Sequence, residues 1–166
     1  MAMLRFLKHV FSGPWSVKRA FPQRSLGAIE AAIAASEQSH LGEVRFAVEG
    51  ALDIGDLLRS TTARDRALEI FSLNRIWDTE HNSGVLIYLL LADRRVEIVA
   101  DRGIHGKVGE AGWQRICRDM ENQFRRGDFE PGVLGGIAAI TEQLQQHFPA
   151  GTKANPNEIA NAPLLL

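Results

Sequence analysis

The sequence predicts an α/β fold in which helices cover both faces of a small mixed sheet, and three observations lead to it. Residues 85–92 form an unbroken apolar run rich in branched side chains, which is typical of a central strand buried on both faces. Residues 44–49 and 95–100 largely alternate between apolar and polar side chains, as half-buried strands do. Segments with apolar residues at helical spacing precede, separate and follow these strands. Two-sided burial of the central strand requires helices on both sides of the sheet.

Length and composition bound the architecture further. A chain of 166 residues with 45% hydrophobic and 23% charged side chains indicates one globular domain with tails. The single cysteine, Cys117, cannot form an intrachain disulfide, which is typical of a reducing compartment. The net charge of -1 predicts no bulk attraction to nucleic acid, and no run approaches the roughly 18 apolar residues that cross a bilayer. We therefore expect a cytoplasmic protein that binds no nucleic acid and contacts membranes at most peripherally.

Local signals predict the individual helices and strands. Ser25 predicts the N-cap of the first helix of the domain, and Thr62 with Asp65 resembles a capping box at the start of another. The charged residues of that second helix, which include Arg66 and Glu69, are expected to form a solvated face. The expected elements are, in order, helix 25–40, strand 44–49, helices 53–59 and 62–75, strands 85–92 and 95–100, and helices 110–125 and 128–148.

The connections between these elements set the expected topology. A long crossover separates the first two strands, which favours a parallel pair with a right-handed connection. Asp93-Arg94 favours a two-residue turn, so the next two strands are expected to form a hairpin in which Ala92 faces Arg95. The sheet is therefore expected to contain both parallel and antiparallel neighbours.

Charge and composition divide the chain into three parts. Residues 1–24 hold five basic side chains and no acid, whereas the rest of the chain holds 14 basic and 20 acidic side chains. We expect residues 1–23 to form a basic tail or a short amphipathic helix at a membrane surface, residues 24–149 to form the α/β domain, and residues 150–166 to form a disordered tail.

The segment that enters the central strand is the main candidate for a functional site. It places two carboxylates, an imidazole and an amide within five residues, and the expected hairpin pairing brings further polar groups to the same end of the sheet. The side chains expected to converge at this rim are Asp78, Glu80, His81, Asn82, Asp101, His105 and Glu110.

These side chains suggest a divalent cation site. Carboxylate and amide oxygens are suitable ligands for calcium or another divalent cation, and the five expected to bind it are Asp78, Glu80, Asn82, Asp101 and Glu110. His81 and His105 are the candidates for catalysis on a metal-activated water. The spacing matches no specific metal motif, so an acidic loop capped by turns, with both histidines solvated, is the structural alternative.

Two further features were weighed beside this rim. Glu49, Asp53 and Asp93 lie at the opposite end of the sheet, where ligands often bind at the carboxyl ends of strands, and they form a second acidic candidate. The glycine-rich stretch 103–112 matches neither a Walker loop nor a dinucleotide-binding fingerprint, so no nucleotide cofactor is expected.

Several short motifs between residues 27 and 148 follow the order of a known family. They are Arg64, Arg66, Ala67 and Phe71 in a helix, Asn82-Ser83-Gly84-Val85-Leu86-Ile87 entering a strand, Asp93-Arg94 with Val96-Glu97-Ile98 in a hairpin, Arg102-Gly103-Ile104, and Phe124-Arg125-Arg126-Gly127-Asp128-Phe129 with Gly132. Together these motifs resemble the TPM-domain family. In two places the chain differs from the family pattern, because His81 replaces the usual aspartate before Asn-Gly and Glu110 stands about where Asp is common.

The resemblance implies a three-layer αβα sandwich of Rossmann-like architecture, acidic residues that can bind calcium, and the acid phosphatase activity of some plant members. Many members are membrane-tethered or exported, and we expect this chain to differ from them because it shows no convincing signal peptide or membrane span. We therefore expect a non-catalytic or weakly catalytic TPM-like module that binds a divalent cation and a protein partner or membrane complex. The alternatives are a metal-dependent acid phosphatase acting on phosphomonoesters and a membrane-peripheral adaptor that uses residues 1–24.

Overall fold

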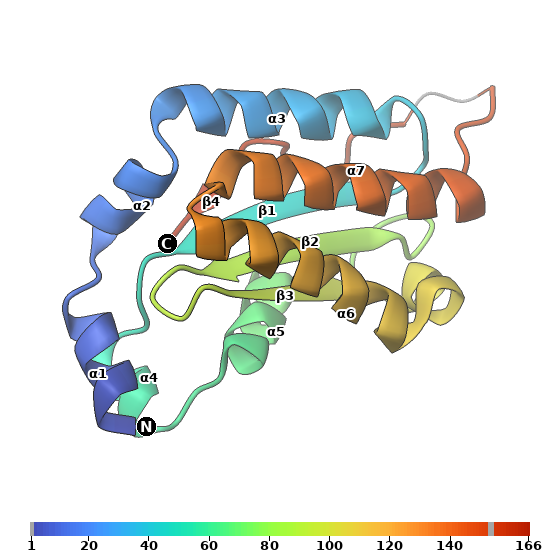
Figure 1. Ribbon diagram of the computed structural model, residues 1–166. Coiled ribbons are helices and arrows are strands. Elements are labelled where there is room, and N and C mark those ends of the chain that lie inside the picture. Colours follow the sequence, from blue (N-terminus) through green and yellow to red (C-terminus); the bar gives the residue numbers. More distant parts are fainter. Residues whose placement is uncertain (1, 153–154) are drawn as a thin grey trace.

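The computed structural model describes residues 2–152 and 155–166 and shows a four-stranded sheet in the strand order β3-β2-β1-β4 (Figure 1). The strands are β1 (Glu43–Glu49), β2 (Gly84–Leu90), β3 (Arg95–Ala100) and β4 (Leu164–Leu165). β1 runs parallel to β2 and to β4, whereas β2 and β3 are antiparallel. The predicted parallel pair and the predicted hairpin are therefore both confirmed.

Helices cover both faces of this sheet, which confirms the α/β fold class. One face packs against α3 (Gln23–Glu37), α6 (Arg102–Arg126) and α7 (Phe129–His147), and the other packs against α5 (Ala63–Leu73). Alternate side chains of β2 enter the two cores: Val85, Ile87 and Leu89 face the first, and Leu86, Tyr88 and Leu90 face the second. β2 is buried along its whole length, as its apolar run predicts.

Three short helices lie at the end of the sheet where β1 and β2 finish. They are α1 (Ala2–Val10), α2 (Pro14–Ala20) and α4 (Ile54–Leu58), and α1 lies beside α4 in Figure 1. Residues 1–23 were expected to form a tail or an amphipathic helix, and the structure has helices over most of this segment. No helix in the described residues is both long and apolar enough to span a bilayer.

The hairpin register differs from the prediction by two residues. Leu90 pairs with Arg95 and Val85 pairs with Ala100, so the connection is a four-residue turn and Ala92 does not face Arg95. The backbone N–H groups of Leu91 and Ala92 instead donate to the carbonyls of Glu49, the last residue of β1, and of Gly50, which comes directly after it. A shift of two residues keeps every side chain on its expected face.

The start of α6 also differs from the prediction. The helix was expected from about residue 110, but it begins at Arg102, with Asp101 as its N-cap. The glycine-rich stretch is therefore helical, with one kink at Gly109, whose φ of 73° is accessible to glycine at little energetic cost. Ile104 is fully buried in the core, and this burial offsets the low helix propensity of the surrounding glycines.

The expectation that residues 150–166 are disordered is wrong for the described part of this segment. Leu164 and Leu165 pair with Ala47 and Val48 as strand β4, and Ile159 is buried. The side-chain amide of Asn155 donates to the carbonyls of His40 and Gly42, which fixes the segment to the start of β1. These partners lie more than 100 residues away in the sequence, so local composition gives no signal for them.

Candidate functional site

The structure brings two of the predicted rim residues together. Asp101 is buried at the N-terminus of α6, and its Oδ1 accepts a hydrogen bond from the Arg102 backbone N–H at 2.7 Å. Its other oxygen, Oδ2, is buried and has no hydrogen-bond partner among the described residues. Asn82 lies next to this cap, because its carbonyl oxygen would be only 2.4 Å from a Cβ on Gly103. Only glycine fits between them without displacing backbone.

The remaining rim residues have other partners. Asp78 forms an exposed ion pair with Arg75 at 2.6 Å, and Glu110, beyond the kink of α6, accepts a hydrogen bond from Gln114 at 2.9 Å. His105 is half-buried one turn into α6, where its backbone N–H donates to the Asp101 carbonyl.

Glu80 and His81 form a further contact within the predicted set. Glu80 Oε2 lies 3.9 Å from His81 Nε2, and the backbone N–H of Glu80 donates to the carboxylate of Glu158. Within the described residues, no three His, Cys, Asp or Glu side chains gather closely enough to hold a metal ion. As a set, the five predicted ligands do not fit a divalent cation in this arrangement. Asp101 Oδ2 is the one buried side-chain oxygen of this set that has no hydrogen-bond partner among the described residues.

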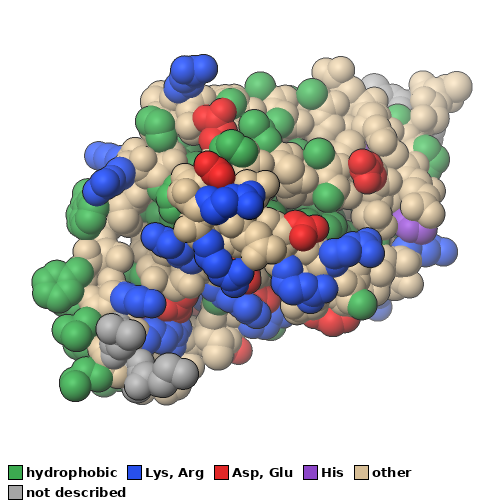
Figure 2. All heavy atoms as spheres, in the orientation of Figure 1, with side chains coloured by type: hydrophobic (Ala, Val, Ile, Leu, Met, Phe, Trp, Pro, Cys, Tyr) green, Lys and Arg blue, Asp and Glu red, His purple; other side chains and the backbone are tan. Residues whose placement is uncertain are grey.

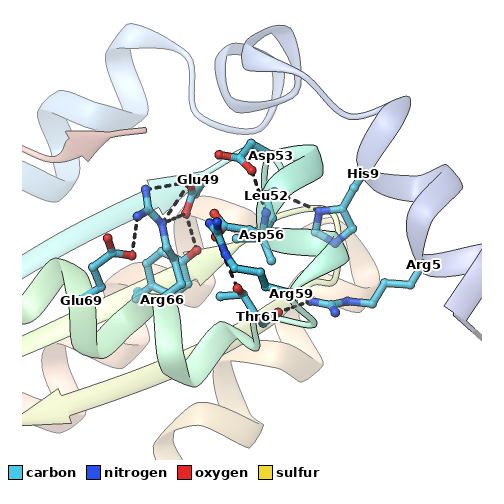
Figure 3. A network of polar contacts seen from close by, with 11 residues as sticks. Arg5, His9, Glu49, Leu52, Asp53, Asp56, Arg59, Thr61, Arg66 and Glu69 are labelled. Atoms are coloured by element: carbon cyan, nitrogen blue, oxygen red, sulfur yellow. Dashed lines mark hydrogen bonds and ion pairs between the residues drawn. The ribbon is translucent and has the colours of Figure 1, made fainter.

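The opposite end of the sheet holds a denser polar network, shown in Figure 3. Glu49, at the end of β1, accepts hydrogen bonds from Arg66 Nε at 3.0 Å and from Arg66 Nη2 at 3.1 Å. Tyr88 of β2 donates its hydroxyl proton to the same carboxylate at 2.5 Å. Burial and the adjacent Glu49 carboxylate raise the pKa of the Tyr88 hydroxyl, so it stays protonated and acts as a donor. Arg66 was expected on a solvated face, and that expectation is wrong because its guanidinium turns inward to Glu49.

The other acids at this end stabilise chain connections. Asp53 caps α4 by accepting a hydrogen bond from the Asp56 backbone N–H at 2.8 Å. Asp56 in turn pairs with Arg59 at 2.8 Å, and this hydrogen bond lowers the pKa of the Asp56 carboxyl. These carboxylates are therefore occupied by partners within the protein, and the second acidic candidate has a structural role in the arrangement observed.

Asp93, the third acid of that candidate, holds α1 against the domain. Arg5 Nε lies 3.0 Å from Asp93 Oδ2, and Arg5 Nη2 donates to the Thr61 carbonyl at 3.1 Å. His9 is only 2% exposed, and its Nδ1 accepts a hydrogen bond from the Leu52 backbone N–H at 3.0 Å. His9 Nε2 lies 3.1 Å from Asp93 Oδ1, in an electrostatic contact whose angle is not that of a hydrogen bond. The side of α1 that faces the protein is therefore polar.

The side of α1 that faces outward is apolar. Met3 is 79% exposed and Phe11, directly after the helix, is 73% exposed, with Leu7 and Val10 also exposed between them. Trp15 of α2 continues this exposed surface. Figure 2 shows apolar side chains along this edge of the molecule with Lys and Arg side chains beside them. We call Met3, Leu7, Val10, Phe11 and Trp15 the N-terminal apolar face. The usual arrangement, with the apolar side of a helix packed inward, is reversed here.

The sequence predicts that residues 1–23 form a basic tail or a short amphipathic helix, but it does not predict the roles of Arg5 and His9. The spacing of four residues between them is the one local signal, because it places both side chains on the same face of a helix. Their partners, Asp93 and Leu52, are 88 and 43 residues away in the chain. No signal in the sequence connects these positions.

Comparisons with known proteins place this architecture in a family. No curated protein matches the chain. The BA42 protein from the psychrophilic bacterium Bizionia argentinensis has a solved structure that is 27% identical, with a TM-score of 0.77 over 88% of this chain and 95% of that one. The N-terminal domain of a protein from P. gingivalis, at 22% identity, shares the fold with a TM-score of 0.63 over 79% of this chain and 82% of that one. The family model described as the TPM domain matches residues 19–143, so the chain belongs to the TPM-domain family.

Proposed function

We propose that this TPM domain is a peripheral membrane-binding module that attaches to an anionic lipid surface through the N-terminal apolar face. The observation that carries the proposal is the reversed orientation of α1. Arg5 and His9 fix the polar side of the helix to Asp93 and Leu52, so the apolar side is presented to the surroundings. Because the helix is already folded and docked, binding to a membrane surface does not have to overcome the loss of conformational entropy that folding there would cost.

The charges around the face support a lipid surface as its occupant. Residues 1–24 contain five basic side chains and no acid, and Lys8 and Lys18 are exposed beside the apolar face. Each Lys or Arg near an anionic bilayer contributes about 1 kcal/mol of attraction. Trp15 and Phe11 are the aromatic side chains expected at the boundary between headgroups and acyl chains. Stable peripheral attachment needs two signals, and this face combines an apolar and a basic one.

Co-sedimentation with vesicles tests the proposal. The full chain is expected to bind vesicles that contain phosphatidylglycerol and to bind neutral phosphatidylcholine vesicles more weakly. Phe11→Ser is expected to weaken binding by about 10-fold or more, because burying a phenylalanine contributes about 1.5–3 kcal/mol. The matched control is Leu73→Ser on α5, which removes a large side chain that is 70% exposed outside the face.

Three results would overturn this proposal, two of them in the vesicle experiment itself. One is an absence of wild-type binding to the anionic vesicles, and the other is an equal loss from Phe11→Ser and Leu73→Ser. If the wild-type chain instead self-associates in sedimentation velocity and Phe11→Ser abolishes that association, the face is a protein interface and the lipid proposal fails.

A divalent cation remains a second candidate because of one specific atom, the buried and unpartnered Asp101 Oδ2. Calorimetry with calcium, magnesium and zinc tests it, and a bound ion is expected to raise the Tm of the wild-type chain but not of Asp101→Asn. If no ion binds, both this candidate and the phosphatase alternative lose their support. If one binds, a phosphomonoester assay with Asp101→Asn and His81→Ala decides whether the domain is an enzyme. Turnover that survives both substitutions would come from a contaminant or another site, and an absence of turnover would favour a non-catalytic partner-binding role.

A further inference from the structure

A pocket of 590 Å³ opens beside α2, next to the N-terminal apolar face. Its wall is built from three segments that are distant in the sequence, namely α2, the turn between β2 and β3, and the junction of α6 and α7. Trp15 both lines this pocket and belongs to the N-terminal apolar face, so the two features are continuous. A molecule with an apolar part at the face can therefore place another part in the pocket.

Two arginines line the pocket. Arg19 comes from α2 and Arg94 from the turn between β2 and β3, and both are exposed. Neither forms an ion pair with any residue that the structure describes. Lys and Arg side chains gather on this side of the molecule in Figure 2.

The two acids that line the pocket have partners of their own. Asp128 Oδ2 lies 3.4 Å from Nε of Arg126, which does not line the pocket, and Glu130 accepts a hydrogen bond from the Ser25 hydroxyl. The Asp128 carboxylate is therefore ion-paired and the Glu130 carboxylate is hydrogen-bonded, whereas the two guanidinium groups form no ion pair among the described residues. Guanidinium binds phosphate oxygens through paired N–H donors, a geometry that lysine cannot provide.

The inner surface of the pocket is apolar. Leu91 is buried beneath it, and Phe129 packs edge-on against Phe21 with ring centroids 5.8 Å apart. An apolar floor below two cationic groups fits a ligand that carries both a phosphate and a hydrocarbon part. A fully hydrophilic phosphate compound would leave this floor without contacts.

We propose that this pocket binds the phosphate headgroup of a single membrane lipid, whose acyl chains lie along Trp15 at the N-terminal apolar face. This inference rests on the proposed membrane function and adds a specific lipid site to it. Arg19 and Arg94 hold the phosphate, and Trp15 contacts the first part of the acyl chains. The domain then recognises a lipid as well as a charged surface.

A matched pair of double variants separates the pocket from general attraction. Arg19→Gln/Arg94→Gln removes two charges from the pocket, and Arg115→Gln/Arg118→Gln removes two charges from exposed positions of α6 that do not line it. The probe is a short-chain phosphatidic acid below its micelle concentration, titrated into each full-length variant and followed by NMR. The pocket variant is expected to lose about 10-fold or more in affinity, because it loses charge-assisted hydrogen bonds to the phosphate, whereas the control is expected to change less than about 2-fold.

Glycerol 3-phosphate serves as the second probe and distinguishes a lipid from a free phosphate. Weaker binding of glycerol 3-phosphate than of the lipid by about 10-fold or more supports the lipid site, and equal binding of the two overturns it. Equal losses from the two double variants, or no binding of the lipid to the wild-type chain, also overturn it.

The vesicle experiment and the short-chain lipid titration test the two proposals separately. If Phe11→Ser abolishes vesicle binding while the short-chain lipid still binds, both proposals stand. If the wild-type chain binds vesicles but not the short-chain lipid, the membrane function stands and the headgroup site is wrong.

Discussion

Replacing Arg66 with leucine should destabilise the domain far more than removing a shorter ion pair on its surface. Arg66 and Glu49 have side chains that are only 20% and 9% exposed, and the guanidinium makes three hydrogen bonds to this carboxylate. Arg66→Leu leaves the Glu49 carboxylate buried with Tyr88 as its remaining side-chain donor. Removing one partner of a buried ion pair costs about 3–5 kcal/mol, and the remaining exposure of Arg66 places the expected loss near about 3 kcal/mol.

The control is Arg75→Leu, because Arg75 pairs with Asp78 at 2.6 Å, closer than the 3.0 Å between Arg66 and Glu49. The side chains of that surface pair are 72% and 49% exposed, so its loss should cost less than about 1 kcal/mol. Thermal unfolding should show a fall in Tm of about 6–12 °C for Arg66→Leu, at about 2–4 °C per kcal/mol, and of at most about 4 °C for Arg75→Leu.

The double variant Glu49→Gln/Arg66→Leu should lose less stability than the sum of the two single variants, because the buried charge is removed together with its partner. If Arg66→Leu loses no more stability than Arg75→Leu, then burial does not determine how much these ion pairs stabilise the fold, and the reasoning is refuted.

The remaining predictions concern pH and two glycines. Burial raises the pKa of Glu37 from 4.5 to about 7, so the folded state holds a proton that the unfolded chain releases at lower pH. The stability of the wild-type chain relative to Glu37→Gln should therefore fall as pH rises from about 4.5 to about 7, and a pH-independent difference in urea unfolding would contradict this. Gly84→Ala should destabilise the domain by about 1–3 kcal/mol or more, because its Cβ would lie 1.9 Å from the Ile76 carbonyl oxygen. Gly106→Ala, with no atom within 4 Å of its Cβ, should stabilise α6 by about 0.5–1 kcal/mol, and losses from both substitutions would show that these glycines are equivalent.

Much of the fold could be predicted because its signals are local. The apolar run of β2 is buried on both faces as expected, and Thr62 with Asp65 forms the predicted capping box. The hairpin exists as predicted, but its register does not follow from Asp93-Arg94 alone, because Leu91 and Ala92 bond to the residues that end β1. A turn sequence specifies that the chain reverses, whereas contacts with a third segment decide where pairing begins.

The elements that were missed depend on distant partners. Strand β4 has only two residues and follows a polar segment, which gives no periodic signal. It is held by its pairing with β1 and by the hydrogen bond from the Ile159 N–H to the buried carboxylate of Glu43. The same limit applies to the predicted cation rim, because Asp101 and Asn82 are neighbours in space while Asp78 and Glu110 turn to partners on their own segments. Sequence placed these side chains at one end of the sheet but could not give their directions.

The N-terminal helix shows why amphipathic periodicity alone does not assign a surface. The spacing in residues 2–10 gives one polar and one apolar side, and the usual inference packs the apolar side inward. That inference fails because Asp93 contacts both Arg5 and His9 and the Leu52 backbone N–H donates to His9, whereas Met3 and Phe11 stay largely exposed. An unpaired buried polar group costs about 1–3 kcal/mol, so the polar contacts can decide the orientation of so short a helix. The apolar side is then left exposed, as the proposed attachment to a lipid surface requires.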